Sequence, residues 1–186
     1  MMPSLAVTVP DPLPRVGPRV LLRRLSTADL SAFQTYRHDE QLGRYQSWKP
    51  QSEQEALAFI TKMGNAPLFS LGKWVQLGIA CREINSLIGD VGIRISDSGE
   101  KAEVGFTLST QSHGVGLATE AVKETIGLLF EHTSVAHVVG ITDARNDPAI
   151  GVLERVGMRK VETLKAIFRG EPCLEHVYVL SRHDAG

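Results

Sequence analysis

The hydrophobic period of the sequence changes abruptly between Ser109 and Ala118, and this change constrains the fold more than any other feature. Before Ser109, apolar and polar residues alternate, as they do in a half-buried β-strand. From Ala118 to Leu129, apolar residues recur every three or four positions, which is the spacing of one buried helix face. Gly114 and Gly116 lie between the two patterns. The chain therefore contains a strand-to-helix unit with a glycine-containing turn.

The same criteria predict the elements around this unit. We expect strands near residues 19–25, 74–83, 87–96, 102–109, 136–143, 160–168 and 174–181, and helices near 27–38, 52–64, 118–129 and 148–156. Turn residues at Asn85-Ser86 and Asp97-Ser98-Gly99 separate three of the strands, which predicts an antiparallel meander. The sequence thus predicts an α+β fold with one βαβ crossover.

The 186 residues fit one domain. Five prolines within residues 1–18 predict a flexible arm, followed by a single domain over 19–182 and a short tail at 183–186. No apolar run reaches the roughly 18 residues of a membrane span, and no export signal precedes the fold, so we expect a cytoplasmic protein without a membrane partner.

Composition excludes several classes of function. Twenty Lys and Arg residues against 21 Asp and Glu residues give a net charge of -1, which argues against a nucleic-acid partner. The two cysteines lie far apart and the six histidines are scattered, so we expect neither a disulfide framework nor a metal site.

The glycine turn itself suits a phosphate. Without a Cβ, Gly114 and Gly116 let backbone N–H groups approach a pyrophosphate, and the helix start adds a partial positive charge. The alternative is a tight turn with no ligand. A dinucleotide fingerprint would need a third glycine at Thr119, so a nucleotide-binding protein of another fold is the weakest of our hypotheses.

Three longer motifs resemble the GNAT acetyltransferase superfamily, especially its ribosomal-protein alanine acetyltransferase branch. These are Ala-Glu-Val-Gly-Phe-Thr-Leu at 102–108, His-Gly-Val-Gly-Leu-Ala-Thr-Glu-Ala at 113–121, and the segment from Asn146 to Met158. Arg19–Arg23 and Tyr45-x-x-Trp48-x-Pro50 add weaker agreement. The resemblance implies a central, mixed and mostly antiparallel sheet of about seven strands with four flanking helices, and it places the βαβ crossover at a cofactor site.

The resemblance implies that the cofactor is acetyl-CoA. Main-chain groups near Leu108 would pair with its pantetheine arm. The expected pyrophosphate loop comprises His113, Gly114, Val115, Gly116, Leu117 and Ala118, together with Thr119 at the helix start. For His113, packing or a phosphate contact is favoured over catalysis. Asn146 would contact pantetheine, cap the following helix, or do both.

The expected chemistry is direct attack of a primary amine on the thioester. Glu103 is the candidate general base, and its alternative is an exposed carboxylate or an ion pair. Relatives carry a tyrosine acid where Leu153 stands, so this assignment fails here. Tyr45 and Trp48 would shape the acceptor site, or Trp48 would anchor its loop on the core.

We therefore expect an acetyl-CoA-dependent N-acetyltransferase that acts on a small-molecule amine or a protein N-terminus, as a monomer or a homodimer. Because the tyrosine is missing at Leu153, a noncatalytic acyl-CoA sensor of the same fold is the alternative.

Overall fold

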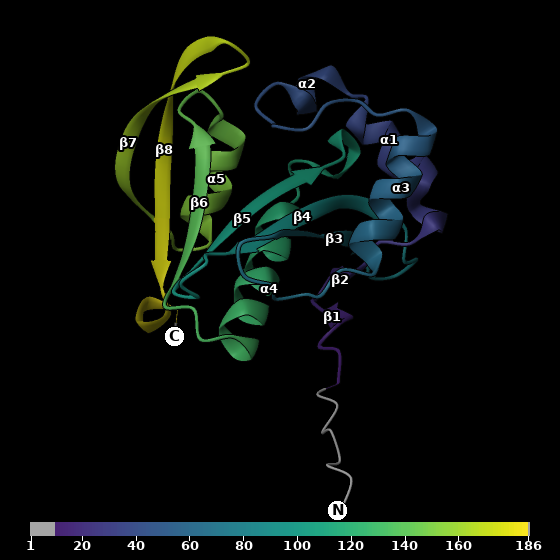
Figure 1. Ribbon diagram of the computed structural model, residues 1–186, viewed down its shortest axis with the longest axis horizontal. Coiled ribbons are helices and arrows are strands. Elements are labelled where there is room, and N and C mark those ends of the chain that lie inside the picture. The colour runs from purple at the N-terminus through teal and green to yellow at the C-terminus, as the bar shows by residue number, and fades with distance from the viewer. Residues whose placement is uncertain (1–9, 186) are drawn as a thin grey trace, which may run out of the picture.

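A computed structural model describes residues 10–185, and it contains one open sheet with the strand order β1-β2-β3-β4-β5-β6-β8-β7 (Figure 1). The strands are β1 (Arg15–Val16), β2 (Val20–Arg24), β3 (Trp74–Cys81), β4 (Leu87–Ile95), β5 (Lys101–Leu108), β6 (His137–Asp143), β7 (Arg159–Phe168) and β8 (Glu171–Ser181). Neighbouring strands are antiparallel except β5 and β6, which are parallel. The predicted mixed, mostly antiparallel sheet is confirmed.

The described residues contain five α-helices, which are α1 (Leu30–Arg37), α2 (Glu40–Gly43), α3 (Glu53–Gly64), α4 (Leu117–His132) and α5 (Asp147–Arg155). Of these, α2, α3 and α5 begin at residues whose side chains cap them. Ser52 forms the predicted capping box at the start of α3: its hydroxyl accepts the Glu55 N–H and the Glu55 carboxylate accepts the Ser52 N–H. Such a cap contributes about 1 kcal/mol to helix stability.

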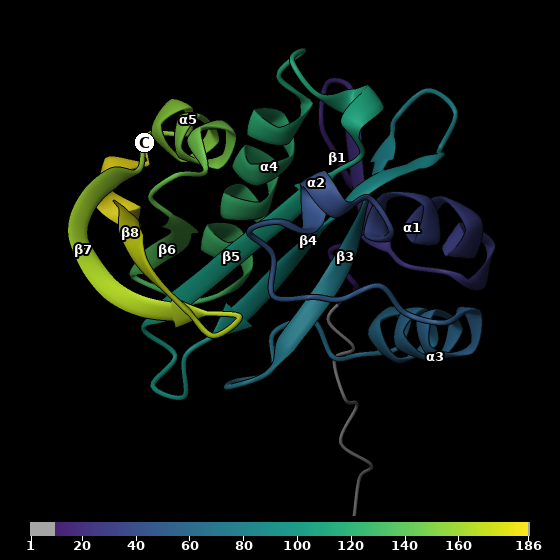
Figure 2. The same ribbon diagram turned by 90° about the horizontal axis from the view of Figure 1, so that it is seen from above.

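The helices form two layers on opposite faces of the sheet (Figure 2). Alternate residues of β3, β4 and β5 point to one face, where they pack against the buried side of α4 in the larger core. On the other face, α1 and α3 enclose a smaller core around Phe33, Tyr36 and Ile60. Helix α4 connects β5 to β6 and completes the predicted βαβ crossover.

Two elements were not predicted, β1 and the four-residue helix α2. We expected residues 1–18 to be an arm and the domain to begin at Arg19. Residues 1–9 lie outside the described residues, but Arg15 and Val16 pair with β2, so the sheet begins earlier than predicted. The Arg15 guanidinium bonds Glu124 and Glu131 on α4 at 2.7 Å. The sequence could not reveal this strand, because two residues are too few to show a period of two, and because the side-chain partners of Arg15 lie more than a hundred residues away.

At the other end, the short 3-10 turn Arg182–Asp184 includes the first residues of the predicted tail. None of the helices within residues 10–185 combines the length and the apolar character that crossing a membrane would require.

Candidate active site

The parallel strands β5 and β6 pair over only half of their length. Their register runs from Lys101 opposite His137 to Val104 opposite Gly140, and past this point the strands diverge (Figure 1). The space between them, which we call the gap pocket, is a cavity of about 60 Å³. Its lining includes Tyr45, Gln46, Gly105, Asn146, Ala149 and Leu153.

The β5 edge of this gap carries backbone groups without a strand partner. Ser109 donates its N–H to the Ile88 carbonyl on the β4 side. Because successive strand residues direct their backbone groups to opposite edges, those of Leu108 and Phe106 face the gap. The Phe106 carbonyl accepts a bond from the Gln46 amide at 3.3 Å. The N–H groups of Leu108 and Phe106 therefore remain as donors for an extended ligand.

The His113 side chain connects the following loop to the end of β5 through a hydrogen bond. Its Nε2 lies 2.9 Å from the carbonyl oxygen of Leu108. Since a carbonyl oxygen can only accept, Nε2 carries the proton and the ring serves as a donor. The predicted packing role of His113 is therefore the one the geometry supports, and a phosphate contact stays a prediction.

The glycine loop has the backbone conformation that its composition predicts. Gly114 and Gly116 have φ angles of +77° and +83°, in the left-handed region that other residues avoid. A Cβ on Gly114 would meet no heavy atom within 4 Å, so the space beside it is open. Gly116 is the N-cap of α4 and supplies no side-chain acceptor, which leaves N–H groups of the first turn for an anion.

Arg19 and Glu120 hold this loop, and sequence reasoning missed their pairing. The Arg19 guanidinium donates to the Val115 carbonyl at 2.8 Å and to the Glu120 carboxylate at 2.9 Å. Glu120 also accepts the backbone N–H groups of Arg19 and Val20. Burial raises the pKa of Glu120, but these hydrogen bonds outweigh it and keep the pKa below its ordinary value. A second guanidinium, that of Arg155, donates to Thr119 at 3.2 Å.

Glu103 lies on β5, on the sheet face opposite α4, directly opposite Arg94 of β4. Burial raises the pKa of its carboxyl group; the nearby Arg94 lowers it and the nearby Glu175 raises it further. Among residues 10–185, no salt bridge involves Glu103. The geometry therefore does not support the ion-pair alternative, and a raised pKa suits a group that must take up a proton.

Gly105, two residues further along β5, faces the same side as Glu103. It is exposed although it lies inside a central strand, and a Cβ at this position would meet no heavy atom within 4 Å. An isolated glycine in a strand pattern is a sequence signal for close approach by a ligand, and it could have identified this position. The sheet surface at Gly105 is therefore open between the side chains of Glu103 and Thr107.

The loop after α2 covers this open surface at Thr107. The Trp48 indole N–H donates to the Thr107 hydroxyl at 3.3 Å, and the Arg37 guanidinium lies 4.7 Å from the Trp48 ring. Tyr45 lines the gap pocket, and the guanidiniums of Arg44 and Arg145 lie 5.2 and 5.7 Å from its ring. Trp48 is thus an anchor of its loop as well as part of a cavity wall.

A buried charge network fixes α1 beneath this loop. Asp90 of β4 is fully buried and accepts hydrogen bonds from the Tyr36 hydroxyl, the Arg37 guanidinium and the Gln76 amide. Burial, followed by the charge of Asp90, raises the pKa of Tyr36 well above its ordinary value. The network holds Arg37 under Trp48 and so positions the loop.

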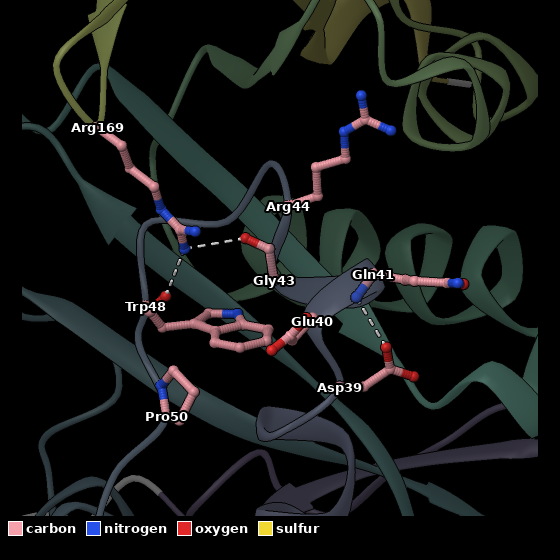
Figure 3. Close-up of a pocket in the computed structure, with 8 residues that line it drawn as sticks. All are labelled: Asp39, Glu40, Gln41, Gly43, Arg44, Trp48, Pro50 and Arg169. Carbon is pink, nitrogen blue, oxygen red and sulfur yellow. Dashed lines mark hydrogen bonds between the residues drawn. The ribbon is translucent and has the colours of Figure 1, made fainter.

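A larger cavity of about 600 Å³ opens beside Trp48 (Figure 3). Arg169, in the turn between β7 and β8, reaches across and donates to the carbonyls of Gly43, Gln46 and Trp48. Figure 3 shows this guanidinium directed at the loop. The β7–β8 turn therefore holds the loop in place.

Helix α5 supplies the remaining predicted residues. Asn146 is the N-cap of α5 and accepts the Ala149 N–H at 3.4 Å, while it also lines the gap pocket. Leu153 is buried, and it provides no hydroxyl group where relatives of the resembled family carry tyrosine. The nearby Tyr178 hydroxyl donates to Glu154 at 3.2 Å. Residues 10–185 contain no group of three His, Cys, Asp or Glu side chains that could hold a metal ion.

A divergent strand pair, a left-handed glycine loop at a helix start and a half-buried carboxylate define a cofactor-dependent transferase fold of the GNAT type. The profile of the acetyltransferase (GNAT) domain matches residues 19–159, so the chain belongs to this acetyltransferase family.

Relatives and solved structures agree with this assignment. The chain is 24% identical over 164 residues to the uncharacterized N-acetyltransferase p20 of Bacillus licheniformis, covering 88% of this chain and 92% of that protein. A GNAT acetyltransferase of Bacillus anthracis superposes with a TM-score of 0.81 at 20% identity, over 90% of this chain and 98% of the other. RimL, a ribosomal L7/L12 N-acetyltransferase solved with coenzyme A, gives 0.76 at 16% identity, over 92% and 98%. At these identities the structures establish the fold.

Proposed function

We propose that this protein transfers the acetyl group of acetyl-CoA to a primary amine in the gap pocket. The observation that carries the proposal is the divergence of β5 from β6 beside an open Gly105 and a carboxylate with a raised pKa. RimL with coenzyme A and the microcin C7 self-immunity acetyltransferase MccE with acetyl-CoA and AMP share the fold, which supports acetyl-CoA as the donor.

The residues present fit this donor. The free N–H groups of Phe106 and Leu108 suit the amide-bearing pantetheine arm, and Asn146 lies across the gap from them. The loop from His113 to Ala118, with Thr119, would hold the pyrophosphate through backbone N–H groups. The Val115 carbonyl oxygen of this loop already accepts a hydrogen bond from the Arg19 guanidinium, so it is satisfied within the protein.

The thioester supplies an activated acetyl group, so the amine nitrogen forms the new C–N bond as the C–S bond breaks and its electrons leave with sulfur. Glu103 would take the proton that the substrate ammonium must lose before its nitrogen can attack, directly or through water, and the nitrogen would give its second proton to water as the tetrahedral adduct collapses to the amide. A thiol has a pKa near 8.5, so the leaving thiolate takes up a proton from water without a dedicated acid. The missing hydroxyl at Leu153 is therefore compatible with turnover.

The acceptor would lie over Gly105, between Glu103 and the loop that carries Tyr45 and Trp48. RimL is described as acetylating a ribosomal protein N-terminus, so peptide termini and small amines are both reasonable acceptor classes. The test is release of coenzyme A from acetyl-CoA with a panel of peptides, polyamines and aminoglycosides. Amine-dependent release supports the enzyme.

The alternative is a noncatalytic acyl-CoA sensor, which the buried Leu153 at the tyrosine position favours. The sensor would bind acetyl-CoA without amine-dependent release of coenzyme A across the whole panel. Tight binding together with no turnover would therefore replace the enzyme by the sensor.

A further inference from the structure

Positive charge gathers around the mouth of the acceptor site. Arg44 and Arg169 line the larger cavity, while Arg145 and Lys165 line a neighbouring cavity of about 420 Å³. Arg44 and Arg145 approach the Tyr45 ring, which itself lines the gap pocket. Two guanidinium groups therefore lie beside a residue that lines the gap pocket.

Two of these four cations, Arg145 and Arg169, already have partners. Arg145 binds Asp143 with two parallel hydrogen bonds of 2.8 and 2.7 Å, so this carboxylate is neutralised. Hydrogen bonding to Arg145 lowers the pKa of Asp143, so the pair stays ionised at neutral pH. One amino group of Arg169 is shared by three loop carbonyls.

Arg44 is different. Within residues 10–185 its guanidinium takes part in no hydrogen bond or salt bridge, and Figure 3 shows it extending away from the other labelled side chains. Its acidic neighbours form no salt bridge with it among the described residues: Asp143, whose pKa the charge of Arg44 helps to lower, is bound by Arg145, and Glu40 lines the same cavity without an ion pair to Arg44. Asp39 lines the same cavity, but its two oxygens accept bonds from the start of α2 and from Thr110. Arg44 is left as a planar donor without an acceptor at the entrance to the gap.

From this arrangement we infer that the acceptor carries an anionic group, a carboxylate or a phosphate, close to its amine, and that Arg44 binds this group. A guanidinium offers two parallel N–H donors that match either anion. The Tyr45 ring lies against the Arg44 guanidinium, and Arg145 brings a second positive charge within 5.7 Å of the same ring. The inference rests on the proposed function, because it specifies the acceptor of the same site.

The test uses matched amines that differ in one charge: phosphoethanolamine against ethanolamine, β-alanine against β-alaninamide, and a peptide with Asp against the same peptide with Asn after its first residue. Coenzyme A release is measured for wild type, Arg44→Gln and Arg44→Lys. Arg159→Gln is the control, because Arg159 is exposed on β7 and lines none of the three cavities.

We expect wild type to prefer the anionic member of a pair, and Arg44→Gln to raise KM for that member about tenfold with little change for the neutral one. Arg44→Lys should retain part of the preference, since the charge remains but the planar pair of donors is lost. The pair that responds identifies carboxylate or phosphate, and small molecule or peptide. Equal KM values within every pair, or equal losses in Arg44→Gln and Arg159→Gln, would overturn the inference.

A binding measurement that needs no turnover distinguishes failure of the proposed function from failure of the anion site. In a Trp74→Phe background, the fluorescence of Trp48 reports on the larger cavity, because it is then the remaining tryptophan. If no amine is acetylated, the proposed function fails. Phosphoethanolamine would still quench this fluorescence in a manner that depends on Arg44 if the anion site exists, and the absence of any such response would refute it.

Discussion

Gly105 offers a test that separates folding from function. A Cβ at this position meets no heavy atom within 4 Å, and the backbone is ordinary strand, so Gly105→Val introduces no clash. Val has the higher strand propensity, on a scale that spans about 1 kcal/mol. We therefore expect the free energy of unfolding to stay the same or to rise by up to about 1 kcal/mol, measured by urea denaturation.

Activity should respond in the opposite direction. The three added carbons would occupy the open surface at Gly105 over which the acceptor approaches, beside Glu103. Reacting atoms must come within roughly 3–3.5 Å, and a displacement of about 1 Å costs on the order of 100-fold in rate. That loss corresponds to about 2.7 kcal/mol of transition-state stabilisation. The assay is kcat/KM for the best amine of the panel.

The control is Lys101→Val, which places the same side chain at an exposed position on the same strand and face. It should retain both stability and activity. A folded Gly105→Val variant with wild-type kcat/KM would refute the reasoning, because the acceptor would then not cross Gly105.

Three further predictions concern the cofactor loop, the base and the buried network. Gly116→Val places a β-branched residue at φ +83°, and should weaken acetyl-CoA binding by about tenfold or more in calorimetry; undiminished affinity would remove the loop from the site. Glu103→Gln should lower kcat far more than acetyl-CoA affinity and abolish the acid limb of the pH–kcat/KM profile. In wild type, this limb should lie above the ordinary glutamate pKa of about 4.3, and an unchanged profile would exclude Glu103 as the base. Asp90→Ala leaves Arg37 buried without its partner and should destabilise by about 3–5 kcal/mol in urea denaturation, whereas a loss below about 1 kcal/mol would contradict the network.

The raised pKa of Glu103 also sets the sign of a stability effect. Burial makes its ionised form less favourable in the folded than in the unfolded state, so folding is favoured by protonation and loses this contribution as pH rises through the folded-state pKa. Glu103→Gln should therefore be at least as stable as wild type at neutral pH. Its advantage should shrink as pH falls through the raised folded-state pKa of Glu103 and should be gone below the ordinary glutamate pKa. This contrasts with the loss of activity in the same variant.

The part of the fold built from local signals could be predicted from the sequence. Period-2 and period-3.6 patterns located β5 and α4, and the Ser52 capping box located α3, because these features depend on residues close in sequence. Strand β1 could not be predicted. It has two residues, too few for a period of two, and the ion pairs of Arg15 with α4 join residues more than a hundred positions apart, which leave no periodic trace.

The features of the candidate site can likewise be divided into those that local sequence predicts and those that depend on tertiary contacts. The glycine loop and Asn146 follow from turn and cap chemistry, and the structure places the loop at the start of α4 and Asn146 in the lining of the gap pocket. The hydrogen bond from Arg19 to the Val115 carbonyl, and the lack of a hydrogen-bond acceptor for Arg44 among the described residues, are properties of the tertiary arrangement. No spacing rule connects residues that are almost a hundred positions apart in the chain, so sequence reasoning could not find them.

The central claim is that one site both holds acetyl-CoA and delivers its acetyl group to an amine. The most direct measurement follows free coenzyme A and N-acetylated amine together, by thiol titration and mass spectrometry, in a reaction started by adding the amine to enzyme that already holds acetyl-CoA. We predict one acetylated amine for each coenzyme A released, with no release and no acetylated protein before the amine arrives. Release without an acetylated amine, or an acetylated protein before amine addition, would contradict direct transfer at this site.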